Sequence, residues 1–248
     1  MSESDLRIER YRAARERAVT RMAEACARAG RHPSEVILVA VSKTVPADAL
    51  RDAVAAGLDL LGENRVQEGV AKAGEIPGAR WQLVGPLQSN KARRALEVFE
   101  SIQSVDSVEL ARRLDRLARE VVPGSRYPVL LQVNVDDDPA KAGFAPGELA
   151  AALEAIGGLE ALDVRGLMTI GRLVSRPEDA RSTFRSLREA SERLRGAGAP
   201  IGPDLSMGMT DDFELAIEEG ATIVRVGRAL FGERAHDHDH GPGADHGH

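Results

Sequence analysis

The chemistry that this sequence could perform centres on one lysine. Lys43 closely follows the apolar run 36–41, read VILVAV, which is typical of a β-strand buried on both faces. Pro46 then opens an amphipathic segment, so the lysine lies in the loop between a strand and a helix. Ligands and catalytic groups collect at this end of parallel strands. A partly buried amine there can form a Schiff base with an aldehyde or ketone, although a surface lysine at a strand end would leave the same pattern.

Two glycine-containing segments near the C-terminus have the composition of an anion site. Residues 206–210 (SMGMT) precede a helix expected to begin near Asp211, and residues 227–232 (GRALFG) follow the last predicted strand. Glycines let backbone N–H groups approach a phosphate closely, and a hydroxyl adds a donor. Barrels commonly bind phosphate on the loops after strands seven and eight. Turn glycines and helix caps would explain either segment alone, so the prediction depends on their occurring together.

Arg225 and Asn64 are further polar residues expected at the same strand ends. Arg225 interrupts an apolar strand, and a buried guanidinium needs a partner because its desolvation is costly. That partner could be a carboxylate such as Glu63 or a ring nitrogen of a ligand. Asn64, after the second predicted strand, could be a helix N-cap or a donor to the ligand. A Schiff-base lysine, a phosphate site and an arginine for a ring nitrogen together describe pyridoxal 5'-phosphate (PLP).

The chain pattern supplies a scaffold that brings strand ends together. Eight short strand-like runs alternate with helix-like segments at spacings typical of βα units. The predicted strands are 36–41, 58–61, 81–84, 101–105, 127–135, 162–169, 205–207 and 222–226. Such alternation implies a parallel sheet, and eight units imply closure into a (β/α)8 TIM barrel of the α/β class. An extra N-terminal helix over 4–29 would cover its outside or its bottom. A doubly wound open sheet is the alternative, but no G-x-G-x-x-G motif follows the first strand.

Length and composition fit one such domain. The chain has 248 residues, is 43% hydrophobic and carries a formal net charge of -6, and a TIM barrel takes about 250 residues. We expect a single domain over 1–234 and a disordered tail over 235–248, rich in His, Asp and Gly, which at most binds a divalent metal loosely. No other metal site is expected.

The same composition excludes several classes of protein. The mild acidity gives no electrostatic footprint for nucleic acid or an anionic membrane surface. No apolar run approaches the roughly 20 residues that cross a bilayer, and the charged first ten residues are no signal peptide. The lone cysteine, Cys26, excludes an internal disulfide and is expected in the core. A cytoplasmic protein is the expectation.

Seven sequence blocks, in order along nearly the whole chain, place these residues in a family. They are AVSKT at 40–44, GENRVQE at 62–68, VGPLQSNK at 84–91, QVNV at 132–135, RGLMTI at 165–170, SMGMTDD at 206–212 and VRVGRALFG at 224–232. With these blocks the chain resembles the YggS/PROSC-type pyridoxal phosphate homeostasis proteins, whose fold resembles the barrel domain of bacterial alanine racemases.

The resemblance implies a role for each site residue. Lys43 would carry PLP as an imine, Arg225 would meet the pyridine nitrogen, and Ser206 with the backbone of Gly227 and Arg228 would hold the phosphate. A threonine is common in this family where Arg228 stands, so a guanidinium replaces a hydroxyl donor here.

The expected function is to hold PLP and take part in its homeostasis without catalysis; the alternative is a PLP-dependent amino-acid racemase. An arginine at the ring nitrogen leaves that nitrogen unprotonated, which weakens the ring as an electron sink. A two-base racemase also needs a second acid/base, and the only tyrosines, Tyr11 and Tyr127, are not at a predicted strand C-terminus. A Schiff-base aldolase on sugar phosphates would not need the buried arginine. The expected partners beside PLP are PLP-dependent apo-enzymes, the expected state is a monomer, and Lys141 is the second candidate for covalent attachment.

Overall fold

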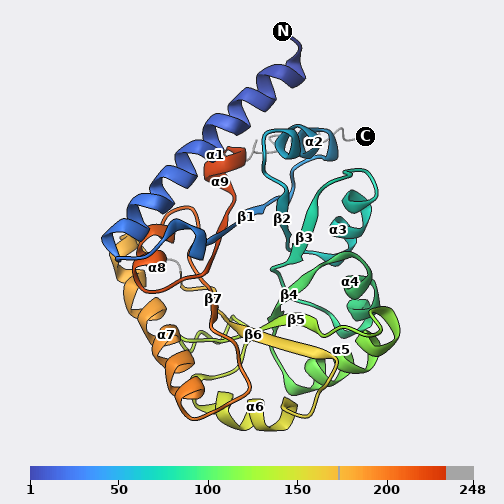
Figure 1. The fold of residues 1–248 in the computed structure, drawn as a ribbon, viewed down its shortest axis with the longest axis vertical. Coiled ribbons are helices and arrows are strands. Elements are labelled where there is room, and N and C mark those ends of the chain that lie inside the picture. The colour runs from blue at the N-terminus through green and yellow to red at the C-terminus, as the bar shows by residue number, and fades with distance from the viewer. Residues whose placement is uncertain (173, 233–248) are drawn as a thin grey trace, which may run out of the picture.

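Eight parallel strands close into a barrel in the order β1-β2-β3-β4-β5-β6-β7-β8, surrounded by helices (Figure 1). The computed structural model describes residues 1–172 and 174–232. The strands are β1 (Ile37–Val41), β2 (Leu60–Glu63), β3 (Arg80–Leu83), β4 (Ser101–Val105), β5 (Tyr127–Gln132), β6 (Leu162–Met168), β7 (Asp204–Ser206) and β8 (Ile223–Val226). The TIM barrel that the alternating pattern predicts is confirmed, and the open doubly wound sheet is wrong. The tail predicted over 235–248 lies outside the described residues.

Helices follow the strands and cover the outside of the barrel. The α-helices are α1 (Glu3–Arg28), α2 (Ala47–Ala55), α3 (Val66–Ala73), α4 (Ala92–Val98), α5 (Val108–Val121), α6 (Leu149–Ile156), α7 (Arg181–Gly196), α8 (Phe213–Glu218) and α9 (Arg228–Phe231). Short 3-10 helices are η1 (Pro33–Glu35), η2 (Ser89–Lys91), η3 (Pro146–Glu148) and η4 (Pro177–Ala180). The parallel strands all point the same way, so their C-terminal ends form one mouth.

The barrel interior has its own apolar cluster, separate from the layer between strands and helices. Its buried members come from strands around the barrel: Val39, Leu60, Val84, Leu130, Met168 and Ile223. Side chains alternate between the two faces of a strand. On β1, Val39 and Val41 belong to the interior cluster, whereas Ala40 belongs to the outer one. The strand ends after the inward-facing Val41, and Lys43 follows two residues later.

Helix α1 lies along one side of the barrel and contacts α2, α8 and α9 (Figure 1). It begins with a capping box, in which Ser2 and Asp5 each accept a hydrogen bond from the other's backbone N–H. One face is apolar and buried, and there Tyr11 meets the ring of Phe231 edge-on, with ring centroids 5.6 Å apart. Cys26 is fully buried on the same face, as predicted. The helix thus covers the outside of the barrel where the last strand meets the first.

Strand ends differ from the prediction in two places that bear on the site. Strand β2 runs over Leu60–Glu63 rather than 58–61, so Glu63 is a fully buried strand residue and not a loop residue. Strand β5 stops at Gln132, whose carbonyl accepts a hydrogen bond from the Phe144 N–H in the loop that follows. Composition alone shows apolar runs and does not show where ladder hydrogen bonds begin and end.

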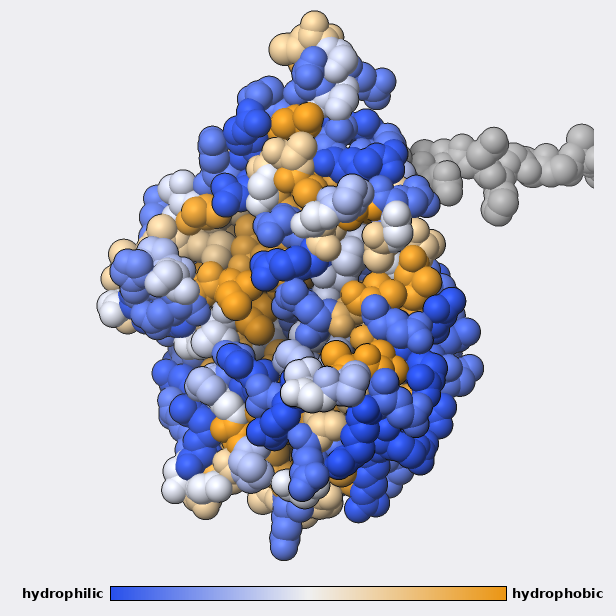
Figure 2. All heavy atoms as spheres, turned by 45° about the vertical axis from the view of Figure 1, so that its right-hand side comes forward, coloured by the Kyte–Doolittle hydropathy of each residue, from blue (hydrophilic) through white to orange (hydrophobic). Residues whose placement is uncertain are grey.

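The molecular surface is mostly hydrophilic on the face shown in Figure 2, with apolar residues gathered in a hollow near its centre. The large apolar side chains that are exposed within the described residues are Met1, Leu6, Val19, Ile37 and Met209. In the described part of the chain, no helix is both long enough and apolar enough to span a membrane.

Candidate cofactor-binding site

Lys43 lies at the barrel mouth, two residues after the end of β1, and its side chain is exposed. The residue before it, Ser42, is fully buried, and its N–H donates to the Gly62 carbonyl at 2.9 Å. The residue after it, Thr44, has a φ of +67°, a left-handed conformation that is unusual for a β-branched residue. The chain therefore turns sharply at a fixed point, and the turn presents the Lys43 amine at the mouth.

An ion pair between the fully buried Glu63 and the half-buried Lys72 holds this turn. Lys72 Nζ, on α3, donates to Glu63 Oε1 at 2.6 Å and to the Ser42 carbonyl at 3.0 Å. Ser42 Oγ donates to the same Glu63 oxygen at 2.8 Å. Glu63 is therefore the partner of Lys72, and the interpretation of Glu63 as the carboxylate partner of Arg225 is wrong.

Arg225 is buried inside the barrel, level with Val39 of β1. Its NH1 donates to Ser206 Oγ at 2.6 Å and its NH2 to the Thr169 carbonyl at 2.7 Å. Burial lowers the pKa of Arg225 to about 10, so the guanidinium stays charged near neutral pH. Two of its five N–H donors are used in this way, and the others meet no acceptor among the described residues. They are free to bind a ligand.

Ser206 is fully buried and joins a line of polar side chains across the barrel interior. Its Oγ donates to Gln103 Oε1 at 2.6 Å, and Gln103 Nε2 donates to Gln82 Oε1 at 2.5 Å. Gln82 Nε2 in turn donates to Glu100 Oε1 at 3.1 Å, where Glu100 precedes β4. Sequence reasoning missed Gln82 and Gln103. The available signal was a glutamine within each of two predicted strands, 81–84 and 101–105.

The two segments predicted to bind phosphate meet beside Arg225. The Arg225 N–H donates to the carbonyl of Gly208, whose φ is +89°. Gly227 lies against β1, where an added Cβ would be 3.3 Å from the Val41 carbonyl oxygen. The exposed Arg228 forms an ion pair with Asp211, so this side chain links the loop after β7 to the loop after β8. The structure thus brings the two predicted loops together at the mouth.

Asn64 is half-buried just after β2, near Lys43 in the register of β1 and β2. The residue in the N-cap position of α3 is Arg65, without a side-chain cap hydrogen bond. The N-cap interpretation of Asn64 is therefore wrong, and its role as a donor to the ligand stays a prediction. Gly85 packs tightly on its backbone, because an added Cβ would lie 2.3 Å from the Asn64 carbonyl oxygen.

Two aspartates that sequence reasoning did not assign to the site also stand at the mouth. Asp106 directly follows β4, and burial raises the pKa of its carboxyl group. Burial likewise raises the pKa of Asp212, although the Met209 N–H, which donates to Asp212 Oδ1 at 2.6 Å, and the charge of Arg225 oppose the rise. The mouth therefore combines cationic groups with carboxyl groups that are easier to protonate than usual.

Lys141, the second lysine considered for covalent attachment, belongs to the loop after β5. Its Nζ lies 3.4 Å from Asp138 Oδ2. Asn134 Nδ2 donates to the carbonyl groups of both residues, at 2.9 Å for Asp138 and 3.3 Å for Lys141. The lysine is folded into its own loop, and its role as a second attachment point stays a prediction.

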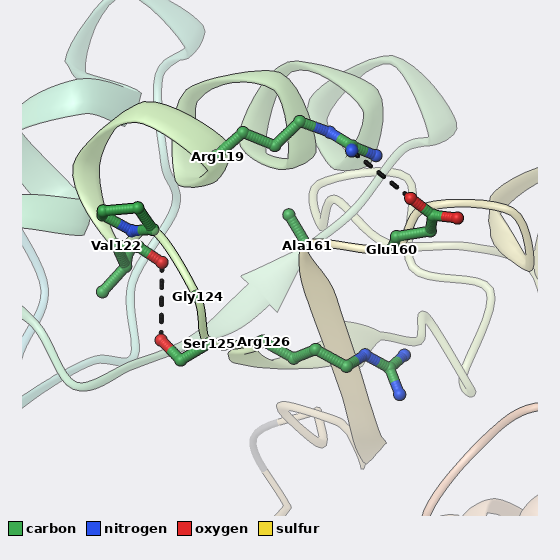
Figure 3. Close-up of a pocket in the computed structure, with 8 residues that line it drawn as sticks. Arg119, Val122, Gly124, Ser125, Arg126, Glu160 and Ala161 are labelled. Carbon is green, nitrogen blue, oxygen red and sulfur yellow. Dashed lines mark hydrogen bonds and ion pairs between the residues drawn. The ribbon is translucent and has the colours of Figure 1, made fainter.

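A surface cavity of about 350 Å³ lies at the other end of the barrel, where α5 ends and β5 and β6 begin (Figure 3). Arg119 NH1 donates to Glu160 at 3.4 Å, and Arg126 Nε donates to the Leu162 carbonyl at 2.9 Å. The cavity holds none of the predicted site residues, and both arginines already have protein acceptors. It is distinct from the candidate site.

Comparison with known proteins identifies the family. Residues 16–235 match the family described as "Alanine racemase, N-terminal domain". A protein of Pseudomonas aeruginosa named "Pyridoxal phosphate homeostasis protein" is 45% identical over 217 residues, which are 86% of this chain and 91% of that protein. The chain belongs to the pyridoxal phosphate homeostasis protein family.

Solved structures agree with this membership in the pyridoxal phosphate homeostasis protein family. PipY of Synechococcus elongatus PCC7942, solved with PLP bound, is 44% identical, with a TM-score of 0.74 over 85% of this chain and 100% of that one. An alanine racemase of Clostridium difficile 630 in complex with cycloserine has a TM-score of 0.64 and 16% identity, over 88% of this chain and 60% of that one. The second likeness shows a shared fold alone, and the resemblance predicted from the sequence blocks is confirmed.

Proposed function

We propose that this chain holds PLP through a Schiff base on Lys43 and takes part in PLP homeostasis without catalysing a reaction of its own. The observation that carries the proposal is the PLP-bound structure of PipY, which is 44% identical to this chain over the whole of PipY. The relatives named as pyridoxal phosphate homeostasis proteins support the same biological role.

The described residues fit the aldehyde, the ring nitrogen and the phosphate of PLP. Lys43 offers an exposed amine at the mouth, and Arg225 offers buried N–H donors that meet no acceptor among the described residues. The backbone N–H groups of Gly227 and Arg228 stand where the phosphate is expected, and Asn64 lies beside the lysine. When bound, PLP supplies an aldehyde that condenses with the Lys43 amine, with loss of one water.

Arg225 favours the holding of PLP over catalysis. A guanidinium can only donate hydrogen bonds, and even with a pKa lowered to about 10 it remains charged at neutral pH. It therefore receives a ring nitrogen as an unprotonated acceptor, and an unprotonated ring withdraws electrons weakly. The protein contributes binding and orientation, with little help for carbanion chemistry.

The visible spectrum of the purified protein mixed with PLP tests the proposal. We expect a yellow complex whose band disappears on treatment with borohydride, and a peptide map with a single labelled peptide that contains Lys43. The reason is that borohydride reduces a Schiff base to a stable secondary amine. A protein that stays colourless with PLP and takes up no reducible label would contradict the proposal.

Racemisation of alanine is the second measurement, because a racemase-like enzyme is the alternative. The OH of Tyr127 donates to the Phe99 carbonyl at 2.5 Å, at the end of the barrel away from the mouth, and Tyr11 packs on Phe231. Neither tyrosine is placed as a second acid/base. The carboxyl groups of Asp106 and Asp212, whose pKa values are raised, stand at the mouth and are the groups that could take the place of a tyrosine. The assay therefore tests a chemically open alternative. We expect the protein loaded with PLP to leave L-alanine unracemised, and clear turnover would establish the enzyme.

The proposal extends to the domain organisation, oligomeric state, location and partners of the protein. We propose one PLP-binding domain over 1–234, a monomer in the cytoplasm, and delivery of PLP to apo-enzymes that depend on it. The net charge of -6 and the lone buried cysteine support a reducing, aqueous setting. Sedimentation of the purified protein measures the oligomeric state directly.

A further inference from the structure

We infer that Ser206 and Gln103 are positioning residues for Arg225, and that Ser206 serves the ring end of the PLP site and not the phosphate end. The inference rests on the proposed function, since it concerns how this chain meets PLP. It changes the role that the family resemblance implies for Ser206, and it gives a role to Gln103.

The starting observation is an unbroken line of hydrogen bonds from Arg225 to Glu100. Arg225 NH1 reaches Ser206 Oγ at 2.6 Å, and Ser206 Oγ reaches Gln103 Oε1 at 2.6 Å. Gln103 Nε2 reaches Gln82 Oε1 at 2.5 Å, and Gln82 Nε2 reaches Glu100 Oε1 at 3.1 Å. Four of the five side chains belong to buried residues.

The carboxylate end of this line determines the direction of every side-chain bond up to Ser206. A guanidinium only donates, and a carboxylate only accepts. Gln82 must therefore turn its NH2 group to Glu100, which leaves its oxygen to accept from Gln103. Gln103 must then turn its own oxygen to Ser206, so the serine hydroxyl donates to it. At the other end, Arg225 can only donate to Ser206, and the serine oxygen accepts that bond with a lone pair.

This direction commits the single hydrogen of the Ser206 hydroxyl. That hydrogen goes to Gln103, while a lone pair of the oxygen accepts from Arg225. A phosphate oxygen would need a donor, and Ser206 has none left. Ser206 is also fully buried on β7, paired in the barrel with Ile223 of β8. The phosphate contacts of the loop after β7 must come from groups beyond Ser206.

For Arg225, the same line fixes the orientation of the guanidinium. Ser206 and the Thr169 carbonyl hold two of its N–H groups, which leaves the others for a ligand. Without the Gln103 oxygen, the Ser206 hydroxyl could rotate and would no longer be held as an acceptor. Hydrogen bonds in a line also polarise one another, so a change at Gln103 is felt at Arg225.

The test compares binding of PLP with binding of pyridoxal, which lacks the phosphate, in the full-length chain. For Ser206→Ala and Gln103→Leu, we expect the Kd values for both ligands to rise by a similar factor, about tenfold, as fits the loss of a hydrogen bond to a charged group. We also expect the absorption maximum of the bound ligand to shift in both variants. Ser206→Thr keeps the hydroxyl and should restore the wild-type maximum.

Gln132→Leu is the matched control, because Gln132 is also a buried glutamine on a barrel strand, at the end of β5. Its Nε2 donates to the Ala142 carbonyl, so it is not part of this line of hydrogen bonds. It should leave the absorption maximum unchanged. If circular dichroism shows that Gln103→Leu does not fold, the same Kd and absorption measurements on the smaller change Ser206→Ala decide the inference.

Two results overturn the inference while the proposed function stands. One is a variant Ser206→Ala that weakens PLP but leaves pyridoxal binding unchanged, which would place Ser206 at the phosphate. The other is a pair of variants that change neither affinity nor spectrum. A wild-type protein that binds no PLP would instead remove the proposed function, and this inference with it.

Discussion

Lys43→Ala is expected to abolish the reducible attachment of PLP completely. In the structure Lys43 is exposed at the mouth, two residues after the end of β1 and directly before the turn at Thr44. Alanine has no amine, so no covalent link forms at this position. Arg225 and the phosphate loops stay in place, so PLP should still bind weakly and reversibly. The measurement is the label that borohydride fixes on the protein, quantified by mass spectrometry of the peptides.

Lys141→Ala is the control for this experiment, because Lys141 is the other lysine considered for attachment. Its Nζ already lies 3.4 Å from the Asp138 carboxylate within the loop after β5. We expect Lys141→Ala to keep the full wild-type label on the peptide that contains Lys43. A Lys43→Ala protein that retains the label, on Lys141 or elsewhere, would show that Lys43 is not the attachment point.

Much of the fold was predictable because the pattern of a barrel repeats. Runs such as 101–105 are short, regularly spaced and flanked by helical segments, and the structure has β4 over the same residues. The helix after it, α5, begins with an ordinary N-cap, in which the Ser107 side chain accepts a hydrogen bond from the Leu110 N–H. The prediction failed at β2, where Leu58 is buried but not in the strand, because burial and ladder hydrogen bonds end at different residues.

The site was predictable only residue by residue. Lys43 and Arg225 stand out in the sequence because each places a cationic group in or beside an apolar strand. Their partners do not stand out. One acceptor of Arg225 is the Ser206 hydroxyl on β7, and that hydroxyl is held by Gln103 on β4, 103 residues away along the chain. Only closure of the barrel brings these strands to face one another across its interior, so no local pattern reports the contact.

The Arg228–Asp211 pair is a similar case. By the family resemblance, a threonine is expected where the sequence has Arg228, which indicates a changed donor in the phosphate loop. The orientation of the Arg228 side chain depends on how the loops after β7 and β8 approach each other. In the structure this side chain forms an ion pair with Asp211. The phosphate contacts proposed here therefore come from the backbone.

Lys72→Met is expected to destabilise the protein by about 3–5 kcal/mol, the usual effect of removing one partner of a buried ion pair. Glu63 is fully buried, and its Oε1 depends on Lys72 at 2.6 Å and on the Ser42 hydroxyl. Its other oxygen, Oε2, is buried with no hydrogen-bond partner among the described residues. Methionine leaves that carboxylate without a cation. Urea unfolding followed by circular dichroism measures the free energy of unfolding.

Lys91→Met is the matched control, since Lys91 is half-buried and its side chain has no ion pair within the described residues. A change within about 0.5 kcal/mol is expected there. The double variant Glu63→Leu, Lys72→Met removes both charges, and we expect it to be more stable than Lys72→Met alone, because no uncompensated charge stays buried. A double variant no better than the single one would show that the stabilisation comes from the contact of Lys72 with the Ser42 carbonyl.

The same pair connects stability to the cofactor site. Lys72 holds the carbonyl of Ser42, the residue directly before Lys43, and Thr44 directly after it is in a left-handed conformation. A turn of this kind persists only where its surroundings hold it in place. We therefore expect the double variant, although it recovers stability, to keep a weakened affinity for PLP. Full recovery of both quantities would mean that the turn presents the Lys43 amine without help from α3.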